Sequence, residues 1–186
     1  MGAESEIKNA AETLTGNTAD GGANGESGGE TAVRAVKRLK FITFFLNGEY
    51  YAVDITKVFE IVIMLEITPV PNTPFYIMGV INLRGNIIQI IDMRLKLSMP
   101  FKKYDEKTCI IIIKAGGATV GIVVDRVMEV ISESSDKIEE TPALGLKVDT
   151  GYIDGIVKSA GKTIFILNFD RVFRDTEYNI NAHAAK

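Results

Sequence analysis

The sequence predicts a mainly β protein built from two related units, and three observations lead to this prediction. Runs rich in Ile and Val, such as residues 77–83 and 87–91, have the length and β-branched content of strands. Turns such as Asn47-Gly48 separate these runs at hairpin spacing. The chain also repeats weakly along its length. A strand-rich unit of this kind is expected to curl into a small barrel, because closure hides its unpaired edges.

The first unit opens with a predicted hairpin of strands 40–46 and 49–53, turned at Asn47-Gly48. Asp54 suits a helix N-cap, and apolar residues follow it at helical spacing. We therefore expect a helix over residues 54–62.

A central hairpin of strands 77–83 and 87–91 completes the first unit, and a short helical turn is expected near residues 92–97. Its turn contains Arg84, and the following Gly85-Asn86 pair supplies residues that tolerate positive φ. A charged arginine at a hairpin turn is unusual enough to mark a candidate functional residue.

The second unit begins with predicted strands 108–114 and 118–124 around a Gly-Gly turn. Residues 125–131 fit either a helical turn or a further strand, and the pattern does not decide between them. A last hairpin of strands 152–157 and 163–169 is followed by apolar residues at short-helix spacing.

The two units, near residues 40–97 and 108–173, align with each other in two blocks. An offset of 69 brings Gly48 onto Gly117, and an offset of 76 brings Gly79 onto Gly155. The second offset also places Arg84 on Ala160. Because the second hairpin turns without an arginine, Arg84 is free to serve something other than folding.

Composition divides the chain into a domain over residues 40–175 and two flanking segments. Residues 1–39 hold none of the aromatic residues and seven of the 17 glycines, which predicts a disordered arm. Residues 176–186 are expected to form a flexible tail. The arm holds four basic and six acidic residues, so the remainder of the chain has 17 basic and 18 acidic residues. This near balance of charge disfavours a nucleic-acid-binding surface.

Chemistry that depends on titrating side chains has few residues to use here. The chain has one histidine, His183, and one cysteine, Cys109, which excludes a His/Cys metal site and an intramolecular disulfide. No nucleophile–base pattern stands out, so we expect a protein that is not an enzyme and binds no cofactor. Residues 1–30 lack the apolar stretch of a secretory signal, and we expect a cytoplasmic protein without membrane insertion.

Several motifs, in the right order between about Lys40 and Phe173, resemble the CheW-like family of chemotaxis coupling proteins. They are Phe-Leu-Asn-Gly-Glu-Tyr-Tyr-Ala-Val-Asp-Ile-Thr-Lys-Val-Phe-Glu-Ile (45–61), Thr-Pro-Phe-Tyr-Ile-Met-Gly-Val-Ile-Asn-Leu-Arg-Gly (73–85), Ile-Ile-Asp-Met-Arg (90–94), Val-Gly-Ile-Val-Val-Asp (120–125) and Tyr-Ile-Asp-Gly-Ile (152–156). The resemblance implies two small five-stranded SH3-like β-barrels around a shared hydrophobic core, with short helices.

The same resemblance implies an adaptor that links methyl-accepting chemotaxis receptors to the CheW-like regulatory domain of the histidine kinase CheA. Such a protein would associate with membrane receptor arrays through its partners. The receptor-facing positions carried over from the family, with Asn82 added beside Arg84, are Val58, Glu60, Gly79, Asn82, Arg84 and Val130. No residue is assigned to the kinase-facing surface.

Four of these positions also have a purely structural interpretation. Val58 and Val130 suit a core, and Glu60 falls away from the apolar stripe of the expected helix, as a solvated glutamate would. Gly79 recurs as Gly155, which favours a backbone requirement. The family usually has proline where this chain has Gln89, a difference expected to leave the candidate site untouched.

Two alternatives remain open. The first keeps the family and changes the pathway, to the kinase of a pilus, motility or biofilm system. The second is a small β-barrel that binds nucleic acid through the basic cluster Arg34, Lys37, Arg38 and Lys40.

Overall fold

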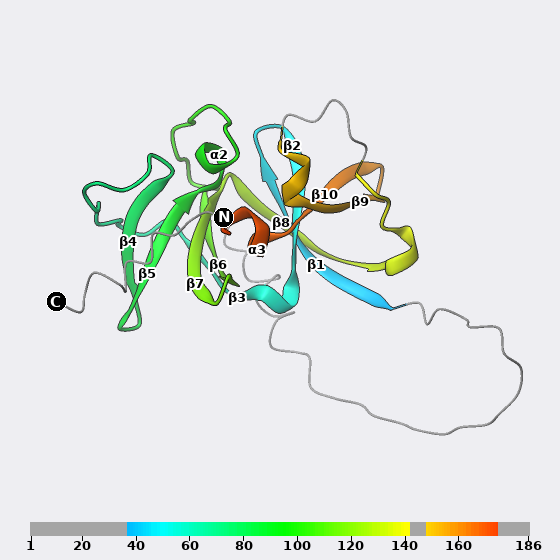
Figure 1. Cartoon of the computed structure of the whole chain (residues 1–186), viewed down its shortest axis with the longest axis horizontal. Helices are drawn as coiled ribbons and strands as arrows, with labels where there is room; N and C mark the ends of the chain where they lie inside the picture. The colour runs from blue at the N-terminus through cyan, green and yellow to red at the C-terminus, as the bar shows by residue number, and fades with distance from the viewer. Residues whose placement is uncertain (1–36, 142–147, 175–186) are drawn as a thin grey trace, which may run out of the picture.

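The computed structural model describes residues 37–141 and 148–174, which form two five-stranded sheets (Figure 1). Sheet A has the order β8 (Arg126–Ser134), β1 (Arg38–Leu46), β2 (Glu49–Asp54), β10 (Lys162–Leu167) and β9 (Ile153–Ser159). Sheet B has the order β3 (Val58–Ile63), β6 (Cys109–Ala115), β7 (Ala118–Val124), β5 (Asn86–Asp92) and β4 (Ile77–Leu83). The short helices are η1 (Ile55–Lys57), α2 (Met93–Lys96), η2 (Ser135–Lys137), η3 (Thr150–Tyr152) and α3 (Phe169–Val172).

The predicted flanking segments lie mostly outside the described residues. Residues 1–36 and the tail 176–186 are among those the structure does not describe. Arg38 and Leu39, which were expected in the arm, are the first two residues of β1.

The two repeat units exchange their hairpins, so neither unit builds a sheet of its own. The β1–β2 hairpin of the first unit lies in sheet A with β8, β9 and β10, while β6–β7 of the second lies in sheet B with β3, β4 and β5. Two parallel pairings, β2 with β10 and β5 with β7, join the units. The prediction that each unit curls into its own barrel is therefore wrong. A lone unit would leave strand edges unpaired, and the hairpin of the other unit covers them.

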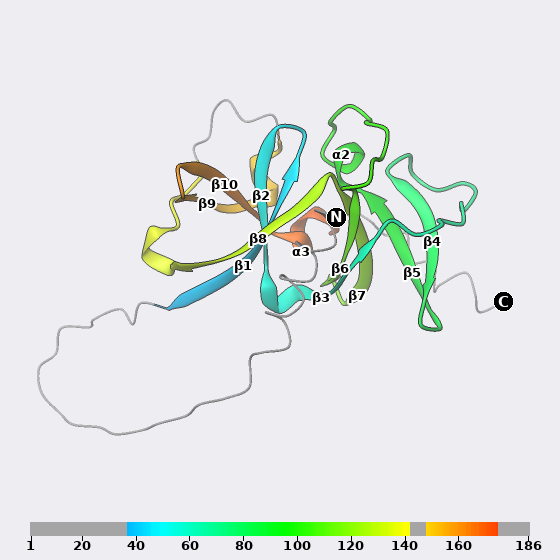
Figure 2. The ribbon, with the colours of Figure 1, turned by 180° about the vertical axis from the view of Figure 1, so that it is seen from behind.

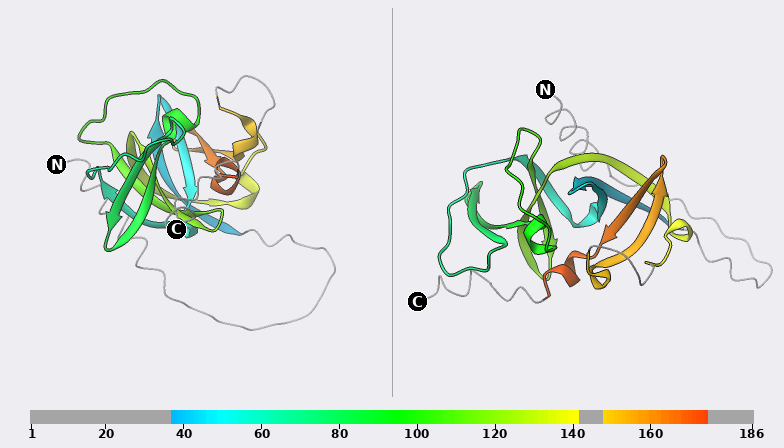
Figure 3. Two further views of the ribbon diagram at one scale, coloured as in Figure 1. Left: turned by 60° about the vertical axis from the view of Figure 1, so that its left-hand side comes forward. Right: turned by 90° about the horizontal axis from the view of Figure 1, so that it is seen from above.

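Both sheets are strongly curled (Figures 2 and 3). Each sheet has an apolar core of its own, and a larger core is shared between the sheets. Phe41, Ala52 and Ile164 belong to the core of sheet A, and Ile88 and Ile110 to that of sheet B. The larger core takes residues from both sheets. Two five-stranded sheets around a shared core confirm the expected fold class.

Within the described residues, neither sheet closes into a continuous barrel ladder. A single bridge links Thr68, beyond β3, to Val80 on β4, and its counterpart in sheet A links Glu139 to Ile156. Gly79 has φ +139°, and a Cβ there would lie 2.1 Å from the Thr68 carbonyl oxygen. The glycine therefore permits the close backbone approach that brings the two edges of sheet B together.

Two polar contacts at matching positions of the repeat hold each sheet to the other. On α2, the buried Arg94 donates from Nε to Asp125 Oδ1 at 2.6 Å and from Nη1 to Asn47 Oδ1 in the β1–β2 turn at 3.0 Å. On α3, Asp170 sits at the position that corresponds to Arg94 at the offset of 76.

The contact on α3 reverses the charges of its counterpart and is far more exposed. Asp170 accepts hydrogen bonds from Lys57 Nζ at 2.7 Å and from the amide of Gly116, in the β6–β7 turn, at 2.8 Å. The hydrogen bond from Lys57, and then that from Gly116, hold the pKa of Asp170 below its ordinary value. The sheets are therefore joined by one buried and one exposed ionic contact.

The expected helix over residues 54–62 is wrong, apart from its first turn. Asp54 does cap a helix, since its side chain accepts a hydrogen bond from the Thr56 amide, but that helix is the single turn η1. The chain then continues as β3. A register shift between Val58 and Glu60 places both Val58 and Ile61 in the shared core. A bulge of this kind imitates helical spacing in a strand sequence. The undecided residues after Asp125 form β8.

Candidate functional site

The candidate site is built around the β4–β5 turn, where Arg84 adopts a left-handed backbone. Its φ is +52° and that of Gly85 is +87°, values typical of a type I′ hairpin turn. The positive-φ pair is thus Arg84-Gly85 rather than the predicted Gly85-Asn86, and Asn86 begins β5. Asn82 supports the turn, because its Oδ1 accepts a hydrogen bond from the Gly85 amide at 2.8 Å.

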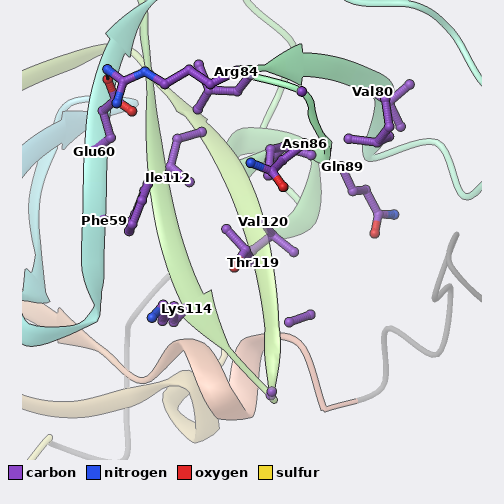
Figure 4. A pocket seen from close by; sticks show the side chains of 17 residues that line it. Phe59, Glu60, Val80, Arg84, Asn86, Gln89, Ile112, Lys114, Thr119 and Val120 are labelled. Atoms are coloured by element: carbon purple, nitrogen blue, oxygen red, sulfur yellow. Dashed lines mark hydrogen bonds and ion pairs between the residues drawn. The ribbon is translucent and has the colours of Figure 1, made fainter.

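Arg84 reaches across the mouth of sheet B and pairs with Glu60 on the opposite edge strand (Figure 4). Its Nη2 lies 2.7 Å from Glu60 Oε1. The Arg84 side chain is 74% exposed and that of Glu60 22%, so the prediction of a solvated glutamate is wrong. An exposed pair of this kind contributes about 0–1 kcal/mol to folding. Most of the guanidinium therefore remains available to a partner.

A groove of about 770 Å³ opens beside this ion pair, and we call it the sheet B groove. Glu60, Arg84, Lys114 and Gln89 contribute to its polar lining. Two buried polar atoms in this lining, Glu60 Oε2 and Gln89 Nε2, have no hydrogen-bond partner among the described residues.

The groove exists because the first and second units differ in side-chain size at matching positions. In sheet A, Lys162 Nζ lies 4.9 Å from the ring centroid of Tyr50. The matching residues in sheet B are Asn86 and Thr119, which are smaller and line the groove.

Gln89 shows the same contrast further along the neighbouring strands. It corresponds to Phe165, whose ring packs against Tyr51 with centroids 5.7 Å apart. In sheet B the matching pair is Gln89 and Val120, which leave the space open. The expectation that Gln89 leaves the site untouched is therefore wrong. Its strand is also interior, since β5 pairs with both β4 and β7.

The other predicted site residues serve the fold in this structure. Val58 is buried in the shared core, and Val130 packs against that core from β8 in sheet A. Gly79 is buried at the Thr68 contact. Of the predicted set, the structure thus brings Glu60 and Arg84 into contact with each other, with Asn82 shaping the turn.

Sequence reasoning missed the apolar part of the site. Phe59 and Ile87 line the groove and are 60% and 56% exposed. The helix expected over residues 54–62 places Phe59 on a core-facing stripe, and Ile87 is hidden within an apolar run. The difference in side-chain size between the two units, as for Thr119 and Tyr50, is the signal that could have located the groove.

Large exposed apolar side chains gather on and around sheet B. Among the described residues they are Phe59, Ile63, Leu65, Phe75, Ile87 and Phe101. Exposed apolar clusters of this kind mark interaction surfaces.

Other kinds of site are not evident in the part of the chain that the structure describes. Residues 37–141 and 148–174 contain no group of three or more His, Cys, Asp or Glu side chains that could hold a metal ion. In these same ranges, no helix has the length and apolar character needed to cross a bilayer.

Comparison with known proteins gives consistent matches over most of the chain. The CheW-like domain model matches residues 40–177. The chain is 35% identical over 147 residues to chemotaxis protein CheW of Klebsiella aerogenes, covering 79% of this chain and 89% of that protein. Identity to CheW of Bacillus subtilis is 37% over 134 residues, covering 72% and 85%.

A further relative and a solved structure extend this comparison. Protein FrzA of Myxococcus xanthus is 26% identical over 145 residues, covering 77% of this chain and 90% of FrzA. The crystal structure of the scaffolding protein TtCheW from Thermoanaerobacter tengcongensis matches with a TM-score of 0.70 and 36% identity. That match covers 77% of this chain and 95% of TtCheW.

Proposed function

Because the chain belongs to the CheW-like family, we propose that it is a non-enzymatic adaptor that couples methyl-accepting chemotaxis receptors to the histidine kinase CheA. It works in the cytoplasm and joins membrane receptor arrays through these partners. Its contribution to signalling is geometric: it holds receptor and kinase together and biases the kinase between states that differ in their contacts.

The observation that best supports a receptor site is the Arg84–Glu60 pair at the rim of the sheet B groove. Arg84 is a mostly exposed cation held by one carboxylate oxygen, and the exposed Phe59 and Ile87 lie beside it. Aromatic and arginine side chains are the residues that most often dominate the binding energy of an interface. The receptor is therefore assigned to this rim, with Glu60 and Asn82 holding Arg84 in place.

Replacing Arg84 with alanine tests this assignment. The variant is expected to lose receptor-dependent control of the kinase and to retain a near-normal melting temperature, because an exposed ion pair adds little stability. The measurements are kinase activity in reconstituted receptor complexes, receptor-fragment binding and a thermal melt.

Lys158→Ala is the matched control, since Lys158 forms a similarly exposed ion pair with Glu139 on sheet A. It should leave receptor control intact. Arg84 would be removed from the site if Arg84→Ala kept receptor-dependent control of the kinase. The same would follow if Lys158→Ala lost that control to an equal extent.

A second candidate function keeps the adaptor role and changes the pathway to a pilus, motility or biofilm kinase. The similarity to protein FrzA, a relative that does not carry the CheW name, supports keeping this alternative. Co-purification from the native cell, followed by identification of the bound kinase and receptor, separates the two. The nucleic-acid alternative is disfavoured by the balanced charge outside residues 1–39.

A further inference from the structure

We propose that the sheet B groove is covered in the free protein by the chain's own C-terminal segment, residues 175–182. The regulatory consequence of this docking rests on the proposed adaptor function: a receptor that uses the Arg84 rim must displace the segment. Docking itself is a property of the chain alone.

The lining of the groove combines apolar and polar side chains. Phe59 and Ile87 are 60% and 56% exposed and offer apolar surface to a partner. Arg84, Lys114 and Gln89 lie in the same lining. The groove thus suits a segment that carries both apolar and acidic side chains.

The described chain also ends near this groove. The contact between Asp170 and the Gly116 amide, at 2.8 Å, holds α3 against the β6–β7 turn. Gly116 and Gly117 in that turn line one end of the groove. Arg174, close after Asp170 in the sequence, is the last described residue. The chain therefore continues from a point close to the groove.

Reach is sufficient for the segment to cross the groove. An extended chain advances about 3.3 Å per residue, so residues 175–182 cover about 26 Å. The groove is lined from β3, β6, β7, β5 and β4, which at about 4.8 Å between neighbouring strands amounts to about 19 Å. A short extended stretch spans this distance without strain in the linking residues.

The charges and the apolar residues of the C-terminal segment also match those that line the groove. The charged lining residues are Arg84, Lys114 and Glu60, and Lys114 makes no ion pair with another described residue. The segment begins with acidic Asp175 and Glu177, followed by Tyr178 and Ile180. In an extended chain, alternate side chains face the same side, so Tyr178 and Ile180 can enter the groove together.

Amide NMR spectra of the protein and of a chain that ends at Arg174 test the proposal. Truncation should shift the amide signals of Ile87, Gln89 and Thr119, and a peptide of residues 175–182 added to the truncated chain should restore them. Tyr178→Ala with Ile180→Ala in the full chain should reproduce the truncation. Unmoved groove signals in both variants would refute docking.

Controls separate this occupant from the others. Deletion of residues 1–36 should leave the amide signals of the groove unchanged. If this deletion shifts them and the C-terminal truncation does not, the groove is occupied by the N-terminal arm and the proposal is overturned. Signals that depend on protein concentration would indicate a segment from a second copy and would also overturn it.

Binding measurements distinguish failure of this inference from failure of the adaptor proposal. If the docked form holds about 90% of the molecules, truncation raises the affinity of a receptor fragment about tenfold. The NMR result needs no partner, so its failure leaves the adaptor role standing. A receptor fragment that binds both chains equally well, despite the NMR shifts, would place the receptor outside the groove and overturn the displacement step.

Discussion

Removing the carboxylate of Asp125 tests whether the buried contact on α2 holds the two sheets together. In Asp125→Ala, the guanidinium of Arg94 keeps its buried position and loses its charged partner. The side chains of Arg94 and Asp125 are 9% and 12% exposed, so little water can replace the lost contact. Breaking a buried pair by removing one partner costs about 3–5 kcal/mol. For a domain of this size, that loss lowers the melting temperature by about 10–20 °C.

The exposed contact on α3 provides the matched comparison. Lys57 and Asp170 are 44% and 48% exposed, and Asp170→Ala should cost about 0–1 kcal/mol. Urea unfolding followed by circular dichroism gives both values on one scale. An Asp125→Ala variant no less stable than Asp170→Ala would refute a structural role for the buried pair. The double variant Arg94→Met with Asp125→Leu should recover much of the loss, because it leaves no buried charge unpaired.

Three further predictions concern the fold. Gly79→Ala should destabilise the fold by about 3 kcal/mol or prevent folding, because its Cβ would meet the rigid Thr68 backbone. Gly155→Ala should cost less, since the closest contact of its Cβ, at 2.4 Å, is a movable Ile138 methyl. Burial, and then the charge of Glu49, raise the pKa of Tyr51 to about 12. Because the unfolded chain loses this proton near pH 10, the free energy of unfolding should fall as pH rises from about 10 to about 12, by up to about 1.4 kcal/mol per pH unit. Urea midpoints across that range should show the fall, and Tyr51→Phe should flatten it. Finally, fragments cut in the loop between α2 and β6 should each remain unfolded and regain strand signal in circular dichroism when mixed; a folded single fragment would contradict the hairpin exchange.

The sequence alone was enough to predict most strands and all four hairpin turns of the described domain. Alternating or continuous apolar runs and turn residues such as Asn47-Gly48 act over a few residues, so their effect can be read locally. The repeat and the family motifs also lie in the sequence itself. Together they led to the fold class and to Arg84 as the charge that one unit has and the other lacks.

Only the tertiary structure decided which strands pair across the two units and what surrounds Arg84. An edge strand can be covered by either hairpin, and that choice depends on contacts between residues far apart in the chain. The bulge before Glu60 then decides that Val58 is buried while Phe59 is exposed. The groove likewise arises from side chains that are small where their counterparts are large, and its open space has no signal in any single stretch of sequence. Burial is a property of the assembled sheets, which is why the sequence located the arginine but not the surface it belongs to.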